Sequence, residues 1–140
     1  MKVYKVCKIE RGNWVSYQVH DMPRLVATYS LGKTTKPKVG LLFAFNTIDS
    51  AKNWNGVNDD DSVILECEGE VEKKLLRGRQ NFCAPNDAPI GSIFKSYMTI
   101  WWDWFLYGNG VPEKIKPFYR GGTCPKGTVL CSKITPIREL

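Results

Sequence analysis

The sequence predicts an α+β fold, in which an antiparallel sheet from the N-terminal half is completed by a strand near the C-terminus. Three observations predict this class. Short alternating apolar and polar segments follow one another through residues 2–72, a longer apolar segment at 90–107 has helical spacing, and 128–134 alternates again. The 140 residues fit a single domain, 1–140.

The N-terminal segment predicts a β-hairpin. Residues 2–9 alternate well enough for a strand, 11–13 are typical turn residues, and 14–19 return as the second arm. This pairing would make neighbours of four large apolar side chains, namely Tyr4, Val6, Trp14 and Tyr17.

Two more strands and a short helix are expected before residue 55. Residues 24–30 predict a third strand, a loop with three lysines occupies 32–38, and an apolar segment follows at 41–45. Thr47 can cap a short helix over about 47–54, which an Asn/Gly/Asp cluster then ends.

The segment 63–72 has the most regular period of two. One face carries Val63, Leu65, Cys67 and Val71, and the other carries Glu66, Glu68, Glu70 and Glu72. Like charges at a spacing of about 7 Å repel one another, so we expect a neighbouring strand to supply cations. The N-terminal strand, with Lys2 and Lys8, is the candidate. A solvated face and a protein-binding face both remain open.

The segment 90–107 predicts the dominant helix, which ends at Gly108. Apolar and aromatic residues cover about two thirds of its circumference, so it needs a second covering surface. We expect a homo-oligomer formed through this helix. A core helix wrapped by loops and a ligand pocket lined by Trp side chains are the alternatives.

Charge is sorted along the chain. The net charge of +6 divides into +6 for residues 1–40, −7 for 41–72 and +7 for 73–140. A strongly cationic surface gathers anionic partners, so this pattern favours an anionic ligand. Nucleic acid is a possible partner of such a surface but is not favoured.

Composition also limits the location and the metal chemistry. The N-terminus lacks the apolar core of a signal peptide and no segment reaches the roughly 18 apolar residues of a membrane span, so we expect a cytoplasmic protein without a membrane partner. The five cysteines are odd in number and widely spread, which is typical of reduced packing residues. Their spacing does not fit a zinc site, and we expect no metal.

No catalytic motif stands out. The sequence Gly32-Lys33-Thr34 imitates the end of a P-loop, but the motif needs glycine where Ala27 stands, and Pro37 would break the following helix. An ADP-ribosyl-transfer site could be imagined from His20, Tyr29 and one of Glu66 or Glu68, without a local signature to support it. We therefore expect neither an enzyme nor a cofactor.

Binding of a phosphate-bearing ligand is better supported, because cationic and aromatic residues occur together near glycine-rich turns. Cations attract phosphate, and aromatic rings stack on bases. The candidate phosphate contacts are Arg77, Arg79, Arg120 and Lys33, and the candidate stacking groups are Phe82, Tyr119 and Trp104.

Short motifs along the chain resemble small accessory proteins of tailed phages and prophages. They include Tyr4-Lys5-Val6, Leu42-Phe43-Ala44-Phe45, Ile64-Leu65-Glu66-Cys67 and Pro125-x-Gly127-Thr128-Val129. Within that group the chain resembles the Thoeris anti-defence sponges, oligomers that sequester cyclic ADP-ribose-type signals without hydrolysing them. The resemblance implies a non-enzymatic sponge for a phosphate-bearing nucleotide. The alternatives are an inhibitor that binds a host protein through the acidic strand, and a small nucleotide-directed enzyme.

Overall fold

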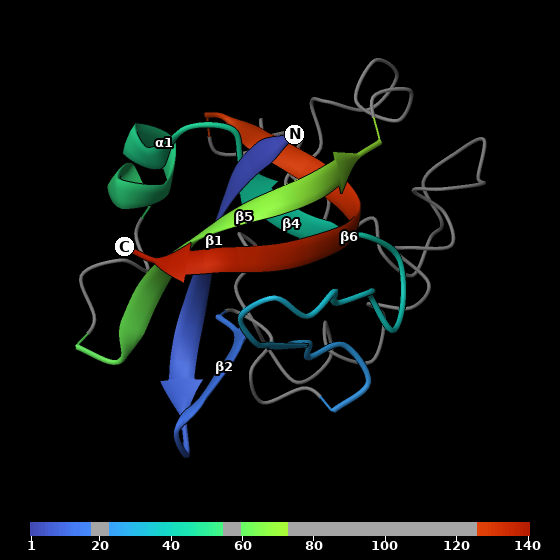
Figure 1. Cartoon of the computed structure of the whole chain (residues 1–140), viewed down its shortest axis with the longest axis vertical. Coiled ribbons are helices and arrows are strands. Elements are labelled where there is room, and N and C mark those ends of the chain that lie inside the picture. The colour runs from blue at the N-terminus through green and yellow to red at the C-terminus, as the bar shows by residue number, and fades with distance from the viewer. Residues whose placement is uncertain (18–22, 55–59, 73–125) are drawn as a thin grey trace, which may run out of the picture.

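The computed structural model describes residues 1–17, 23–54, 60–72 and 126–140. These residues form six strands and one short helix (Figure 1). The elements are β1 (Lys2–Glu10), β2 (Asn13–Ser16), β3 (Thr28–Tyr29), β4 (Leu42–Phe45), α1 (Ile48–Asn53), β5 (Ser62–Val71) and β6 (Thr128–Glu139).

Four of the strands close into a small antiparallel barrel. The strand order is β3-β2-β1-β4-β6-β5, and β5 returns to pair with β1. One edge of β1 pairs with β5 from Lys2 to Lys8, while its other edge meets β4 at Tyr4 and β2 from Cys7 onward. β6 curves between β4 and β5 and completes the circuit (Figure 1). Closure removes the free edges that an open sheet of these strands would expose.

The predicted N-terminal hairpin is confirmed, with Arg11 and Gly12 as a two-residue turn. Their φ angles of 52° and 78° are both positive, as in the type I′ turn that suits the twist of paired strands. The expected strand at 24–30 shortens to β3, because the Ser16 hydroxyl accepts the Ala27 N–H at 3.0 Å in place of a carbonyl. A side chain thus interrupts the ladder one residue before β3.

The prediction that Trp14 joins Tyr4, Val6 and Tyr17 was wrong for Trp14. Tyr4, Val6 and Tyr17 pack on the side of β1 that α1 covers, whereas Trp14 packs against the barrel interior. The cause is register: Trp14 lies opposite Ile9, an odd-numbered residue on the same face of β1 as Cys7.

The short helix is confirmed as α1. The Thr47 hydroxyl accepts the Ser50 N–H at 3.1 Å, which caps the first turn. Ala51 is fully buried, and the Trp54 ring lies 5.3 Å from the ring of Tyr17, edge to face. The helix therefore covers the outer face of the barrel at β1 and β4.

The closing strand is confirmed but runs further than 128–134, through Pro136 to Glu139. A register shift between Glu66 and Cys67 lies beside Pro136, so β6 accommodates a residue without an N–H. The Pro136 carbonyl still accepts a hydrogen bond, from the Gly32 N–H at 2.9 Å.

The described part of the chain is mostly β, and the six-residue α1 is its one helix. The α+β class with a dominant long helix is therefore not borne out, and the segment 90–107 lies outside the described residues. Among the described residues, no helix is long and apolar enough to cross a membrane.

Gly127, the residue before β6, gives a direct test of how closely this part of the chain packs against Ser50 of α1. A Cβ at Gly127 would clash with the Ser50 Oγ and would lie 2.8 Å from the Asn46 Oδ1, whereas a Cβ at Gly12 would meet nothing within 4 Å. Both glycines have positive φ, so Gly12→Ala reports the backbone strain alone. We expect Gly127→Ala to cost about 1–2 kcal/mol more than Gly12→Ala in urea unfolding. Equal losses would contradict this packing.

Candidate functional site

Six of the seven predicted ligand contacts lie outside the described residues: Arg77, Arg79, Phe82, Trp104, Tyr119 and Arg120. Lys33 is described. It is exposed in the segment 32–38, which we call the lysine loop, between β3 and β4.

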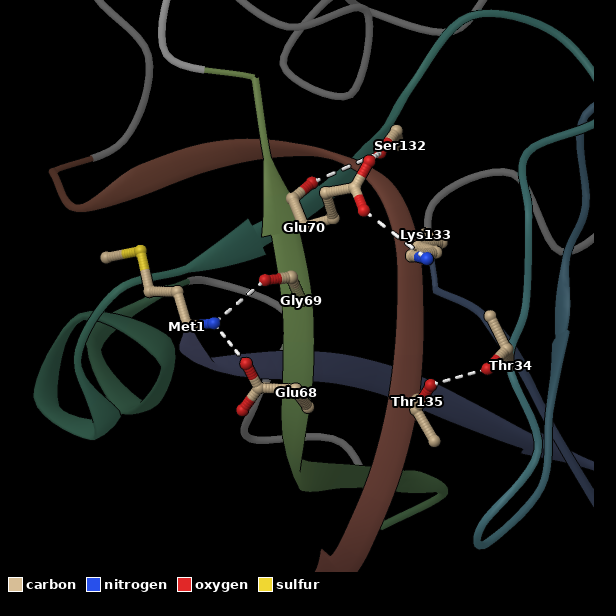
Figure 2. Close-up of polar contacts among 8 residues, drawn as sticks. All are labelled: Met1, Thr34, Glu68, Gly69, Glu70, Ser132, Lys133 and Thr135. Carbon is tan, nitrogen blue, oxygen red and sulfur yellow. Dashed lines mark hydrogen bonds and ion pairs between the residues drawn. The ribbon is translucent and has the colours of Figure 1, made fainter.

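The lysine loop is bound along β6. The Thr35 N–H donates to the Ile134 carbonyl at 2.7 Å, and the Ile134 N–H donates back to the Thr35 carbonyl at 2.9 Å. Beside this bridge the hydroxyls of Thr34 and Thr135 are hydrogen-bonded at 2.7 Å (Figure 2). Backbone bonds therefore hold the loop in one position on the barrel wall, with Lys33 and Lys36 exposed.

The third lysine of the loop is directed elsewhere. The Lys38 Nζ donates to the Pro23 carbonyl at 3.0 Å, which ties the loop to the segment that precedes β3.

The glutamates of β5 are matched by cations of the same chain, as predicted, but two of the four cations, Arg138 and Lys133, come from β6. Glu66 accepts from Arg138 Nε at 3.0 Å and from Nη2 at 3.3 Å, and the Lys2 Nζ lies 3.6 Å away. The hydrogen bonds from Arg138 are the largest cause of a lowered pKa for Glu66. Lys8, the other predicted partner, pairs instead with Asp61 at 3.3 Å.

Glu68 and Glu70 are engaged in the same way (Figure 2). Glu68 pairs with the amino group of Met1. Glu70 accepts from the Ser132 hydroxyl at 2.9 Å and pairs with the Lys133 Nζ at 3.3 Å, and its pKa is lowered, chiefly by the bond from Ser132. Ser132 stands at a register shift of β6, where a bulge redirects its side chain.

A lysine lies inside the barrel, which sequence reasoning missed. Lys5 is 8% exposed, its Nζ donates to the Phe43 carbonyl at 2.5 Å and lies 5.6 Å from the centre of the Tyr29 ring. Burial lowers its pKa. The signal was available in the sequence, because Lys5 has the same phase in β1 as Val3 and Cys7, which are both fully buried.

Three reduced cysteines share this interior, as the sequence predicted for most of the five. Cys7, Cys67 and Cys131 are free and at most 1% exposed. Burial raises the pKa of the Cys7 and Cys67 thiols to about 12 and that of Cys131 to about 11. These thiols are protonated at neutral pH and are poor nucleophiles.

The imagined ADP-ribosyl-transfer site is not assembled by the described residues. Tyr29 is 2% exposed in the barrel core, whereas Glu66 and Glu68 pair with charged partners on the outer face of β5, and His20 lies outside the described residues. Within residues 1–17, 23–54, 60–72 and 126–140, no group of three or more His, Cys, Asp or Glu side chains could hold a metal ion.

Comparison of the chain with protein-family models, with curated proteins and with solved structures gives no significant match.

Proposed function

We propose that this chain is a non-enzymatic binding protein that sequesters a phosphate-bearing nucleotide in the cytoplasm, as the resemblance to phage anti-defence sponges implies. The observation that carries the proposal is the lysine loop. Two backbone hydrogen bonds between Thr35 and Ile134 fix this loop along β6, and the Lys33 and Lys36 side chains are exposed on it. Ammonium groups whose backbone is already ordered lose less conformational entropy when they bind an anion.

The chemistry of the barrel interior supports binding over catalysis. Its thiols are buried and protonated, and Tyr29 is separated from the glutamates of β5 by the sheet itself. A general base and a nucleophile must lie within hydrogen-bond reach of each other, and these groups do not.

The acidic strand is a weaker candidate for the working surface. Three of its glutamates, Glu66, Glu68 and Glu70, are paired with cations of the same chain, so a basic host protein would have to displace Arg138, Lys133 or the Met1 amine to contact them. Each displaced pair lowers the net gain from association. We retain the sponge as the proposal, with oligomerisation through 90–107 as its second part.

The function is tested by native mass spectrometry and calorimetry on the full chain with a panel of nucleotides. We expect an intact nucleotide bound to an oligomer, released unchanged on heating. Arg77→Ala, Arg120→Ala and Lys33→Ala should each weaken binding about tenfold, since a charge-assisted hydrogen bond contributes about 1.5–3 kcal/mol. Lys52→Ala is the control, because Lys52 is exposed on α1.

Three outcomes would count against the proposal. Altered nucleotide after heating indicates an enzyme. Loss of function in a variant with Glu66, Glu68, Glu70 and Glu72 all changed to Gln, with the cation variants intact, indicates a protein-binding inhibitor. Affinity for long DNA or RNA that falls steeply with salt indicates a nucleic-acid-binding protein.

A further inference from the structure

Side chains of the lysine loop and β6 stand in cross-strand rows on the outer face of the barrel. Because Thr35 and Ile134 exchange both backbone hydrogen bonds, they form a hydrogen-bonded antiparallel pair. The pairs on either side of it are then non-hydrogen-bonded pairs, whose side chains approach each other most closely. One flanking row is Thr34 with Thr135, whose hydroxyl contact agrees with this register, and the other is Lys36 with Lys133.

Lys36 opposite Lys133 departs from the charge pattern of the sheet. The registers of β1, β5 and β6 place three pairs of charged outer residues directly opposite each other, and each combines a cation with a carboxylate: Lys2 with Glu68, Arg138 with Glu66, and Lys133 with Glu70. Like charges placed opposite each other destabilise a sheet. A counter-ion from outside the chain would remove this cost.

Glu70 compensates only one of the two ammonium groups. It pairs with Lys133 at 3.3 Å, and Lys36 contributes a further attraction that helps to lower its pKa. Two cations and one carboxylate leave a net charge of +1 in this row. The row can therefore accept an anion without first losing its internal ion pair.

The neighbouring row adds a neutral donor. Thr34 and Thr135 share one hydrogen bond at 2.7 Å, which uses the proton of one hydroxyl and leaves the proton of the other available. Both residues belong to the same outer face as Lys36 and Lys133, two positions along each strand, which is about 7 Å. The long lysine side chains span that distance easily.

We infer that Lys36, Lys133 and the Thr34–Thr135 hydroxyl pair form a phosphate subsite for the ligand. This inference rests on the proposed function and deepens it, because it names the part of the nucleotide that this face takes. Two ammonium groups and one hydroxyl donor match the several acceptor oxygens of a phosphate or diphosphate group. Glu70 acts as the internal counter-ion of the empty subsite.

The experiment compares two lysines of the same loop that differ in their contacts. ADP is titrated into the wild type, Lys36→Gln and Lys38→Gln, each of which loses one positive charge, and affinity is measured by calorimetry. We expect about tenfold weaker binding for Lys36→Gln and for Lys133→Gln, and less than twofold change for Lys38→Gln, whose Nζ is occupied by the Pro23 carbonyl. Adenosine, which lacks a phosphate group, should bind the wild type more weakly than ADP does. Its affinity should be the same for the wild type and for every variant.

A second comparison separates the subsite from a general effect of net charge. Glu70→Gln frees Lys133 and should strengthen ADP binding severalfold, whereas Glu68→Gln makes the same change of charge without releasing Lys133 and should change it less. Equal effects of the two variants, or equal affinities of Lys36→Gln and Lys38→Gln, would overturn the subsite while leaving nucleotide binding intact.

Failure of the proposed function gives a different result. If the wild type binds no nucleotide, inorganic pyrophosphate is titrated instead and the backbone amide signals are followed by NMR. Shifts at Thr34, Thr35, Ile134 and Thr135 that Lys36→Gln abolishes, at an unchanged melting temperature, support an anion site. Absence of these shifts overturns the subsite together with the function.

Discussion

The free energy of unfolding should fall steeply once the pH exceeds 9. The thiols of Cys7, Cys67 and Cys131 have an ordinary pKa of 9.0, which burial raises to about 12, about 12 and about 11 in the folded barrel. Above pH 9 the unfolded chain releases these protons while the folded chain retains them. The folded state is therefore favoured below pH 9, and its advantage is lost as the pH rises toward 11.

The size of the effect follows from the number of groups. Each retained thiol proton costs about 1.4 kcal/mol per pH unit, so three thiols cost about 4 kcal/mol per unit. Lys5 acts in the opposite direction, because its folded pKa is lowered from 10.5 and the unfolded chain binds the extra proton. It offsets at most about 1.4 kcal/mol per unit up to pH 10.5, so the net loss remains large.

Urea unfolding between pH 8 and 10.5, in the presence of a reductant, measures this slope. Cys7→Ala removes one of the three thiols, so its stability should fall by about 1.4 kcal/mol per pH unit less than that of the wild type. The comparison cancels the titrating groups whose pKa does not depend on Cys7. An unchanged slope in Cys7→Ala would falsify the assignment of protonated thiols to the interior.

Local signals were sufficient for most of the elements. The turn at Arg11 and Gly12, the Thr47 cap and the two-residue alternation of β5 each depend on a few consecutive residues, and all three are observed. The local pattern predicted that the last strand ends at residue 134, whereas β6 continues through Pro136. A bulge, which depends on the partner strand β5, accommodates the proline.

The long-range pairing of β1 with β5 was predicted from the lysines of β1 and is confirmed, but the position of β6 could not be predicted. β6 lies between β4 and β5, so Arg138 reaches Glu66 across a pairing that no local pattern indicates. The like-charged row has the same origin, since Lys36 lies opposite Lys133 only because the lysine loop bridges to Ile134. Sequence reasoning proposed Lys33 from its loop but had no means of placing a second cation opposite Lys36.

Lys5→Met should stabilise the protein by roughly 1–4 kcal/mol at pH 7. The Lys5 amine is held in the barrel with a carbonyl acceptor and an aromatic face as its contacts, and neither is a carboxylate. Burial of a charge in such surroundings is costly, and replacing buried charged groups with apolar ones of similar volume often stabilises a protein by about 1–4 kcal/mol. Methionine is unbranched and can occupy the space of the lysine stem.

The pH dependence of this gain separates charge removal from better packing. Because the pKa of Lys5 is lowered, its own contribution to the stability of the wild type becomes more favourable as the pH rises toward 10.5, and Lys5→Met lacks this contribution. The advantage of the variant should therefore be largest at neutral pH and shrink as the pH approaches 10.5. Lys52→Met makes the same change at an exposed position of α1 and should leave stability within about 0.5 kcal/mol of the wild type. A Lys5→Met variant less stable than the wild type at neutral pH would mean that the contacts of the ammonium group with Phe43 and Tyr29 outweigh its loss of hydration.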